Sequence, residues 1–294
     1  MEISMTTDFG GWYGPPEPQL KLIAEAGFTH LHWCHHYNSD FLYRPCEISA
    51  MRRAVASLGL KVLDVHGSHG QEKRYWSLLE YEREAGIELI RNRAELYSGL
   101  EATGALIMHL PYVTVGMEKT AAAQQREFMK QAFRSLDEVM PYLETLGVKV
   151  AFENMPNDNW EVLDAVLKRY PQAGICYDSG HGNRDFKHYD AVFARRSRLT
   201  TLHLNDNNGK ADQHVSPFMG TVDWERVVAI IADSPYDKPL SFELCMRDTP
   251  FQKVAFTPIP SSPAEDQRAY LADAMERCGR VCAMFEAAKK QPGK

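Results

Sequence analysis

The chain has 294 residues, of which 44% are hydrophobic, and a formal net charge of −6 at pH 7. This composition is typical of a folded α/β chain with a substantial core and excludes a largely disordered one. The acidic balance predicts no general attraction to nucleic acid or to anionic membranes, and no run approaches the roughly 18 apolar residues of a membrane span.

Apolar, β-rich runs alternate with longer helical patterns along the chain. The predicted strands are Glu2–Thr6, Phe28–Cys34, Lys61–His66, Ala105–His109, Val148–Glu153, Gly174–Asp178, Thr200–Leu204 and Pro239–Leu244. The predicted helices are Glu17–Ala26, Ile48–Leu58, Leu78–Leu100, Ala121–Leu146, Trp160–Arg169, Tyr189–Arg195, Trp224–Asp233 and Pro263–Ala288. Alternating strands and helices indicate parallel pairing. Eight such units predict a (β/α)8 TIM barrel that spans residues 1–294 as a single domain.

An open, doubly wound sheet is the alternative architecture. Such a sheet commonly carries a glycine-rich phosphate-binding fingerprint after its first strand, and none follows Glu2–Thr6. Gly59 and Gly147 each follow a helical pattern and precede a strand, where glycine supplies the left-handed turn that ends a helix. No linker rich in Pro, Ser or Gly divides the sequence, so the closed barrel is the favoured prediction.

The cysteines and the N-terminus favour a location in the cytoplasm over secretion. The start of the chain lacks the basic residues and apolar run of a secretory signal. The six cysteines form no CxxC pair, and three of them fall in predicted strands or just past them. Free buried thiols in a reducing compartment fit this pattern better than disulfides do. We therefore expect a cytoplasmic protein without membrane partners, and a homo-oligomer is compatible with the sequence.

Polar side chains with metal-binding potential stand where the last four predicted strands end. They are Glu153, Asp178, His203 and Glu243. A barrel gathers its strand ends around one mouth, and three carboxylates with one imidazole suit a divalent metal such as Mn, Mg, Co or Zn. Each residue alone is more often a solvated strand-end side chain, but this coincidence is much rarer on four consecutive strands.

The alternation of side chains along a strand supports this assignment. If Glu153 points into the barrel, Val150 and Phe152 point outward onto the helices. The strands that end at His203 and Glu243 follow the same rule, because their large apolar residues also fall on the helix side. The rule is therefore satisfied in all three strands.

A second group of residues supplies either further metal ligands or substrate contacts. It comprises His66, His109, His181, Asp212 and His214. His181 lies three residues beyond Asp178, and Asp212 and His214 have a short chelating spacing. A lone histidine in such a loop is more often a hydrogen-bonding or structural residue than a ligand, so both roles stay open for this group.

These motifs together resemble the xylose isomerase-like barrel superfamily, which holds sugar isomerases and epimerases beside the endonuclease IV (AP endonuclease 2) family. The resemblance runs from the third strand onward through Phe152-Glu153-Asn154, Asp178-x-x-His181, His203-Leu204-Asn205-Asp206, Asp212-x-His214 and Phe242-Glu243. For the sugar enzymes it implies that Glu153, Asp178, His203 and Glu243 bind one divalent metal. It also implies that the two glutamates handle protons.

The endonuclease IV family gives the alternative function. There the resemblance implies three zinc ions held by nine positions, and both groups of residues named above fill all nine. An enzyme that extrudes a damaged nucleotide needs Arg, Lys and wedge residues around its mouth. The loops at 35–40 and 67–70 contain neither Arg nor Lys. Zinc-dependent hydrolysis at abasic sites in DNA is therefore the less favoured prediction, and nucleic acid the less expected partner.

The favoured prediction is a metal-dependent sugar isomerase or epimerase of carbohydrate metabolism, acting on a ketose or a related polyol. In the expected mechanism the metal stabilises an enediolate while Glu153 and Glu243 act as acid and base. A barrel that binds a polyol or metal without turnover is the non-enzyme alternative, and dehydratases share the scaffold. The sequence leaves open the sugar, its phosphorylation, the choice between isomerase and epimerase, and the number of ions.

Overall fold

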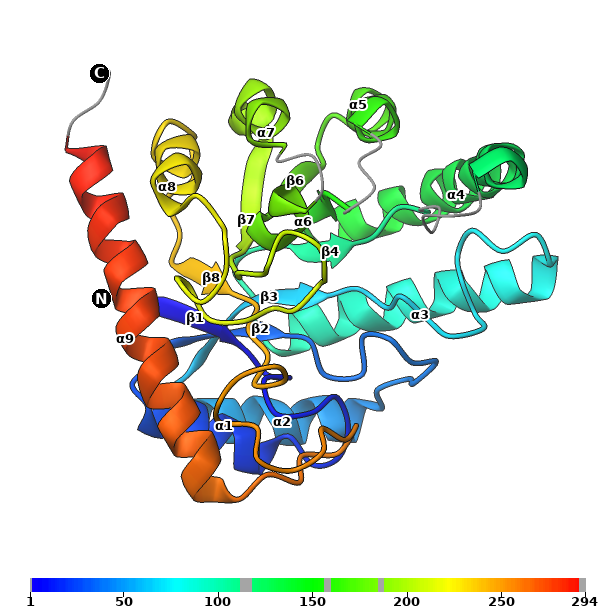
Figure 1. The fold of residues 1–294 in the computed structure, drawn as a ribbon. Coiled ribbons are helices and arrows are strands. Elements are labelled where there is room, and N and C mark those ends of the chain that lie inside the picture. The colour runs from blue at the N-terminus through cyan, green and yellow to red at the C-terminus, as the bar shows by residue number, and fades with distance from the viewer. Residues whose placement is uncertain (1, 112–117, 156–159, 185–187, 291–294) are drawn as a thin grey trace.

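A computed structural model describes residues 2–111, 118–155, 160–184 and 188–290, with only the backbone for 118–122. Strands and helices alternate along the chain (Figure 1). The strands are β1 (Ile3–Thr6), β2 (His30–Trp33), β3 (Lys61–His66), β4 (Leu106–Met108), β5 (Val150–Glu153), β6 (Gly174–Asp178), β7 (Leu199–His203) and β8 (Leu240–Phe242). The helices are α1 (Glu17–Glu25), α2 (Pro45–Ser57), α3 (Glu80–Gly99), α4 (Glu118–Thr145), α5 (Trp160–Arg169), α6 (Ser179–Asn183), α7 (Tyr189–Arg195), the 3-10 helix η1 (Arg196–Arg198), α8 (Trp224–Ala232) and α9 (Ala264–Lys289).

All eight strands form one parallel sheet in the order β7-β6-β5-β4-β3-β2-β1-β8. The two outer strands meet just past their ends, where the Leu204 amide donates to the Ser241 carbonyl at 2.9 Å and the Glu243 amide donates to the Leu204 carbonyl at 3.1 Å. The longer helices surround the strands (Figure 1). The predicted TIM barrel is confirmed, and the open-sheet alternative is wrong.

The core follows the predicted alternation of side chains. Val150 and Phe152 are buried in the main hydrophobic cluster between strands and helices. Ala151, between them in sequence, lies instead in a second, small cluster that includes Cys176. This small cluster fills part of the barrel interior, because its residues share the strand face of Glu153. The outward and inward faces of β5 are therefore as the sequence predicts.

The predicted helices are present, and some boundaries differ from the prediction. Gly59 and Gly147 have φ values of +68° and +67°, which glycine adopts without strain. Helix α2 begins at Pro45, three residues earlier than predicted, because proline suits the first helical position and the Glu47 carboxylate accepts from the Arg44 amide at 2.7 Å. Helix α6 has no counterpart in the prediction, and it lies directly at the end of β6.

The loops that follow β1 and β8 pack against each other at the mouth of the barrel. The Pro258 carbonyl accepts from the Trp12 and Tyr13 amides at 2.7 and 2.9 Å. The Trp12 and Phe256 rings meet edge to face with centroids 5.3 Å apart. Within the described ranges, we find no helix that is both long and apolar enough to cross a membrane. All six cysteines are free, as predicted.

Candidate metal centre and its cavity

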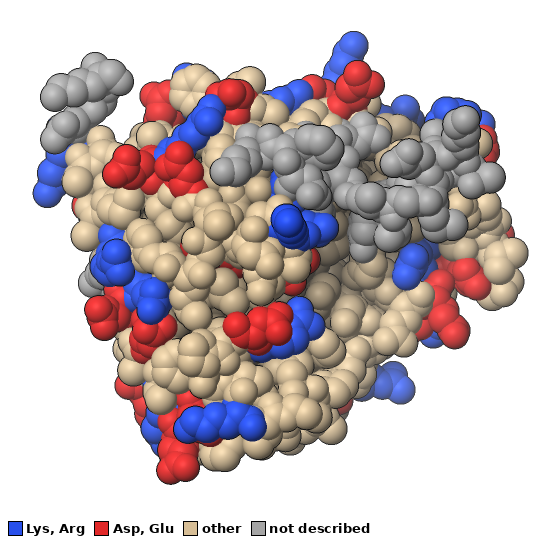
Figure 2. Space-filling view, in the orientation of Figure 1, with Lys and Arg blue, Asp and Glu red and all other residues tan. Residues whose placement is uncertain are grey.

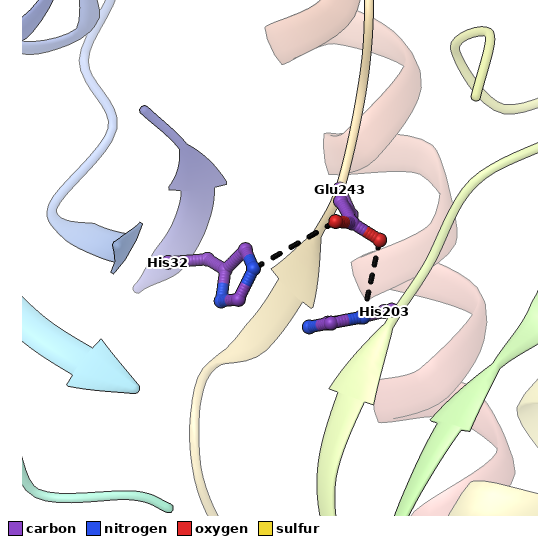
Figure 3. A group of neighbouring side chains, drawn as sticks. All are labelled: His32, His203 and Glu243. Carbon is purple, nitrogen blue, oxygen red and sulfur yellow. Dashed lines mark ion pairs between the residues drawn. The ribbon is translucent and has the colours of Figure 1, made fainter. Parts of the chain in front are cut away.

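The four predicted metal ligands stand at the ends of neighbouring strands, and all are buried. Glu153, Asp178 and His203 are the last residues of β5, β6 and β7, and Glu243 follows β8 directly. His203 Nδ1 lies 3.2 Å from Glu153 Oε2 and 3.1 Å from Glu243 Oε2, and Figure 3 shows the His203 ring beside Glu243. Asp178 joins this group through His181, whose Nδ1 lies 3.8 Å from Asp178 Oδ1 and 3.2 Å from Glu153 Oε1.

The His203 ring is fully buried, and neither of its nitrogens makes a well-directed hydrogen bond among the described residues. Buried polar atoms nearly always have a partner. Two ligand atoms about 2.0–2.2 Å from a shared metal ion lie roughly 3.0–3.4 Å apart. The two distances from His203 Nδ1 to the glutamate oxygens fall in this range. The geometry and the donor types therefore fit one divalent ion between these three side chains.

The second predicted group adjoins the same centre from two sides. His109 Nε2 is hydrogen-bonded to Glu153 Oε2 at 3.0 Å, and His66 Nε2 lies 3.9 Å from that oxygen. On the other side Asp212 bridges two histidines, with its oxygens 3.4 Å from His181 Nε2 and 3.3 Å from His214 Nε2. The predicted residues of both groups thus form one continuous network of carboxylates and imidazoles.

Two trios within this network have potential ligand atoms within 4.8 Å of one another. They are His66 with His109 and Glu153, and Asp178 with His181 and His214. These trios would be able to hold additional ions, so the geometry admits more than one metal in the network.

Two asparagines that have no predicted role fix the orientation of Asp178. Asn205 Nδ2 donates to Asp178 Oδ2 at 2.8 Å. Asn154 exchanges two bonds with the Asp178 backbone: the Asp178 amide donates to Asn154 Oδ1 at 2.7 Å, and Asn154 Nδ2 donates to the Asp178 carbonyl at 3.0 Å. The His181 amide donates to Asp178 Oδ1 at 2.6 Å and caps α6. The short helix therefore exists because the strand-end carboxylate supplies its N-cap.

A protein family is identified by comparison. The family model described as "Xylose isomerase-like TIM barrel" matches residues 20–278. The chain belongs to this family. The family predicted from the motifs is therefore confirmed.

Individual proteins are also similar to this xylose isomerase-like barrel. The chain is 30% identical over 281 residues to "Uncharacterized protein y4fM" of Sinorhizobium fredii, and the alignment covers 84% of this chain and 89% of the relative. Among solved structures, a D-tagatose 3-epimerase-like protein superposes with a TM-score of 0.69 at 20% identity, covering 96% and 100% of the two chains. L-ribulose 3-epimerase gives a TM-score of 0.71 at 15% identity over 99% and 96%. At these identities the two structures show a shared fold.

In this xylose isomerase-like barrel the charges of the network shift each other's pKa values. Burial alone would lower the pKa of His214, but the Asp212 and Glu243 carboxylates raise it to about 10. The pKa of His203 is likewise raised against its burial. Burial opposes the charge of Glu153, yet His203 and His109 hold its pKa well below the ordinary value. Asp178 differs, because burial raises its pKa to about 6.

Sequence reasoning missed a buried pair beneath the centre. His32 on β2 is hydrogen-bonded through Nδ1 to Asp64 on β3, and the Thr201 hydroxyl donates to the other Asp64 oxygen at 2.5 Å. His32 Nε2 lies 3.8 Å from Glu243 Oε1 (Figure 3) and has no hydrogen-bond partner in the described parts of the chain. The available signal was the alternation of β3, which places Asp64 on the same face as His66.

A cavity of about 110 Å³ opens beside Glu243. Its lining residues come from the ends of β1, β2, β7 and β8: Thr6, Asp8, Trp12, Cys34, Tyr37, Asp212, His214, Glu243, Leu244, Cys245 and Arg247. The cavity thus connects the buried network with the mouth of the barrel. It is the space in which a small molecule would reach Glu243.

Proposed function

We propose that this barrel is a divalent-metal-dependent isomerase or epimerase that acts on a small ketose or a related polyol. The observation that carries the proposal is the buried His203 ring, whose Nδ1 lies 3.2 Å from one oxygen of Glu153 and 3.1 Å from one of Glu243. The similar structures named for D-tagatose and L-ribulose 3-epimerisation support the same substrate class. The shared fold alone does not identify the reaction, because one fold hosts many reactions.

The residues that would hold the ion are Glu153, Asp178, His203 and Glu243. A bound Mn, Mg, Co or Zn ion would supply Lewis acidity to the carbonyl and neighbouring hydroxyl oxygens of the substrate. Asp178 would keep its orientation through Asn205 and Asn154, as outer-shell partners commonly ensure for metal ligands. His66, His109, His181, Asp212 and His214 would surround this set as substrate contacts or as further ligands.

The two glutamates would carry the proton transfers. They reach the same point from β5 and from the end of β8, with His109 beside Glu153 and His214 Nδ1 3.5 Å from Glu243. One glutamate would take the proton from the carbon next to the substrate carbonyl, which leaves an enediolate. The other would return a proton to the same carbon in an epimerase or to its neighbour in an isomerase. Glu243 lines the cavity, so a substrate there meets it directly.

Metal analysis and isotope exchange test the proposal. Purified protein is analysed for metal, stripped with EDTA and reloaded separately with Mn, Mg, Co or Zn. Each form is then incubated in D2O with D-tagatose, L-ribulose or D-fructose, and NMR follows epimer formation and deuterium uptake at carbon. We expect one equivalent of metal and deuterium at the epimerised or isomerised carbon. Activity that survives complete metal removal would contradict the proposal.

Variants of the two glutamates test their roles. Glu153→Gln and Glu243→Gln should each lower kcat by at least about 10³-fold, because a general acid–base group typically contributes 10²–10⁴-fold and both would also ligate the ion. Exposed Glu88 on α3 offers a matched control, and Glu88→Gln should leave kcat unchanged. Near-normal turnover in either active-site variant would refute the role.

DNA repair has less support as a function. On the face that Figure 2 shows, outside the grey residues, Lys and Arg stand beside Asp and Glu and form no basic stripe that would follow phosphates. Arg247 is the one Lys or Arg among the cavity-lining residues described. The similar structures reported above are named as sugar epimerases. Three equivalents of zinc together with nicking of abasic-site DNA would reverse this preference.

A further inference from the structure

The cavity beside Glu243 has one wall that the proposed chemistry does not use. This wall is formed by the segment that follows β1, with Thr6, Asp8 and Trp12 among the lining residues. None of these three belongs to the network of predicted metal ligands. The segment therefore faces a bound substrate without taking part in metal binding.

Asp8 stands on this wall with one carboxyl oxygen unpartnered. It lies in the turn that follows β1, lines the cavity and is only 6% exposed. The Thr7 hydroxyl donates to Asp8 Oδ1 at 3.2 Å, whereas Oδ2 has no hydrogen-bond partner among the residues that the structure describes. Burial raises the pKa of Asp8 well above its ordinary range, the bond from Thr7 opposes the rise, and the charge of Glu243 adds to it.

Hydrogen bonds hold the segment around Asp8 in place, which restricts movement of the unpartnered oxygen toward another protein group. The Cys34 amide donates to the Thr7 hydroxyl at 3.0 Å and ties the segment to β2. The Met246 amide donates to the Phe9 carbonyl at 2.8 Å and ties it to the loop after β8. A buried carboxyl oxygen without a hydrogen bond is costly, and a ligand group in the cavity would remove that cost.

The chemistry of the wall selects the kind of ligand. A carboxyl oxygen accepts from a hydroxyl group in either protonation state. Trp12 adds an apolar ring surface beside it, suited to the C–H groups of a carbon chain. Asp212 and Glu243 line the same cavity together with His214 and Arg247, so charges of both signs stand around the wall.

Resting on the function proposed above, we infer that Asp8 is a specificity-determining residue. It binds a hydroxyl group of a polyhydroxylated ketose, away from the carbon that reacts between Glu153 and Glu243. The residue would thus select chains long enough to present this hydroxyl. Asp8 takes no part in the proton transfer.

Substrate truncation tests this inference with the Mn²⁺-loaded full-length protein. Binding is measured by tryptophan fluorescence and calorimetry for D-fructose, which has six carbons, and for L-erythrulose, which has four and lacks the far hydroxyls. Asp8→Ala should weaken D-fructose binding about three- to tenfold, as expected for one hydrogen bond, and change L-erythrulose binding less than about twofold. Asp8→Asn, which preserves size and one acceptor, should lose less. Asp190 on α7 is exposed and gives the control Asp190→Asn, which should leave both affinities unchanged.

The outcomes separate the inference from the proposed function. An equal loss for both ketoses, or no loss for D-fructose, would overturn the role of Asp8 while the proposed function stands. If the wild type neither binds nor converts any ketose, both the function and the inference fall. Melting curves establish that each variant folds, and Asp8→Asn carries the test if Asp8→Ala does not.

Discussion

His35 provides a quantitative test of the loop that follows β2. Its side chain is 6% exposed, its Nδ1 is bonded to the Trp12 carbonyl at 3.1 Å, and its ring lies 4.3 Å from that of His36. Burial lowers the pKa of His35 to about 4; the bond to Trp12 opposes this effect and the charge of Arg93 adds to it. The folded protein therefore keeps this imidazole neutral at pH values where an unfolded chain would protonate it.

The pKa difference sets the sign and size of a stability change. The unfolded chain takes up this proton near pH 6.5 and the folded protein only near pH 4. Between these values the unfolded state binds more protons than the folded state. The contribution of His35 to the free energy of unfolding is therefore fully present above pH 6.5 and is lost as the pH falls toward 4. One pKa unit corresponds to about 1.4 kcal/mol, so His35 should account for a loss of about 3 kcal/mol by pH 4.

Urea unfolding of the metal-free protein between pH 4 and 7 measures this loss. Many carboxylates titrate in the same range, so the useful quantity is the difference between the wild type and His35→Gln. Glutamine can still donate to the Trp12 carbonyl but does not titrate. The decline in unfolding free energy should be about 3 kcal/mol smaller in the variant. Parallel pH curves for the two proteins would refute the reasoning about His35.

Three further outcomes are expected from the same structure. A metal ion at about 1,000 times its Kd should add about 4 kcal/mol to the free energy of unfolding. With an unfolding entropy of about 2.1 cal/mol/K for each of the 294 residues, this gain raises Tm by about 7 °C. A Tm that is unchanged by EDTA and by added Mn, Mg, Co or Zn would contradict the metal site. A Cβ at Gly86 would lie 2.3 Å from the Tyr75 backbone nitrogen, so Gly86→Ala should lower the unfolding free energy by about 3 kcal/mol, measured in guanidinium. Buried Arg93 donates to the His36 and Phe41 carbonyls at 3.1 Å each, so Arg93→Ala should cost about 3 kcal/mol in the same assay, and a cost below 1 kcal/mol would show that these bonds matter little.

The features that the sequence predicts best are those that depend on the residue pattern within a single strand. Glu153, Asp178, His203 and Glu243 each close an apolar run. Alternation then assigns the neighbours to a face, so Glu153 and Phe152 could be placed correctly without any partner strand. The barrel followed from eight repeats of the same unit. Helix α6 escaped detection because its five residues, Ser179–Asn183, carry no apolar periodicity. It is held by the Asp178 cap, an interaction that propensity does not report.

Features that depend on two strands could not be predicted in the same way. His32 pairs with Asp64 because a shift in register between Leu31 and His32 brings them opposite each other. The sequences of β2 and β3 contain no feature that predicts such a bulge. Asp8 is a similar case, since its unpartnered oxygen follows from how the loops after β1, β2 and β8 are tied together. The sequence shows an aspartate after a strand, and only packing shows that it lacks a partner.

The charge balance of the buried network would favour a bound cation. The network contains four carboxylates, those of Glu153, Asp178, Asp212 and Glu243. Burial disfavours uncompensated negative charge, so positive charge has to lie among them. The pKa values of His181, His203 and His214 are raised despite burial because neighbouring groups favour the charged imidazoles: carboxylates at His181 and His214, and Cys176, Glu243 and Glu153 at His203. An imidazole that ligates a metal is neutral. An ion at His203 would therefore take the place of a proton, and Glu243 and Glu153, which favour that proton, would also attract the ion.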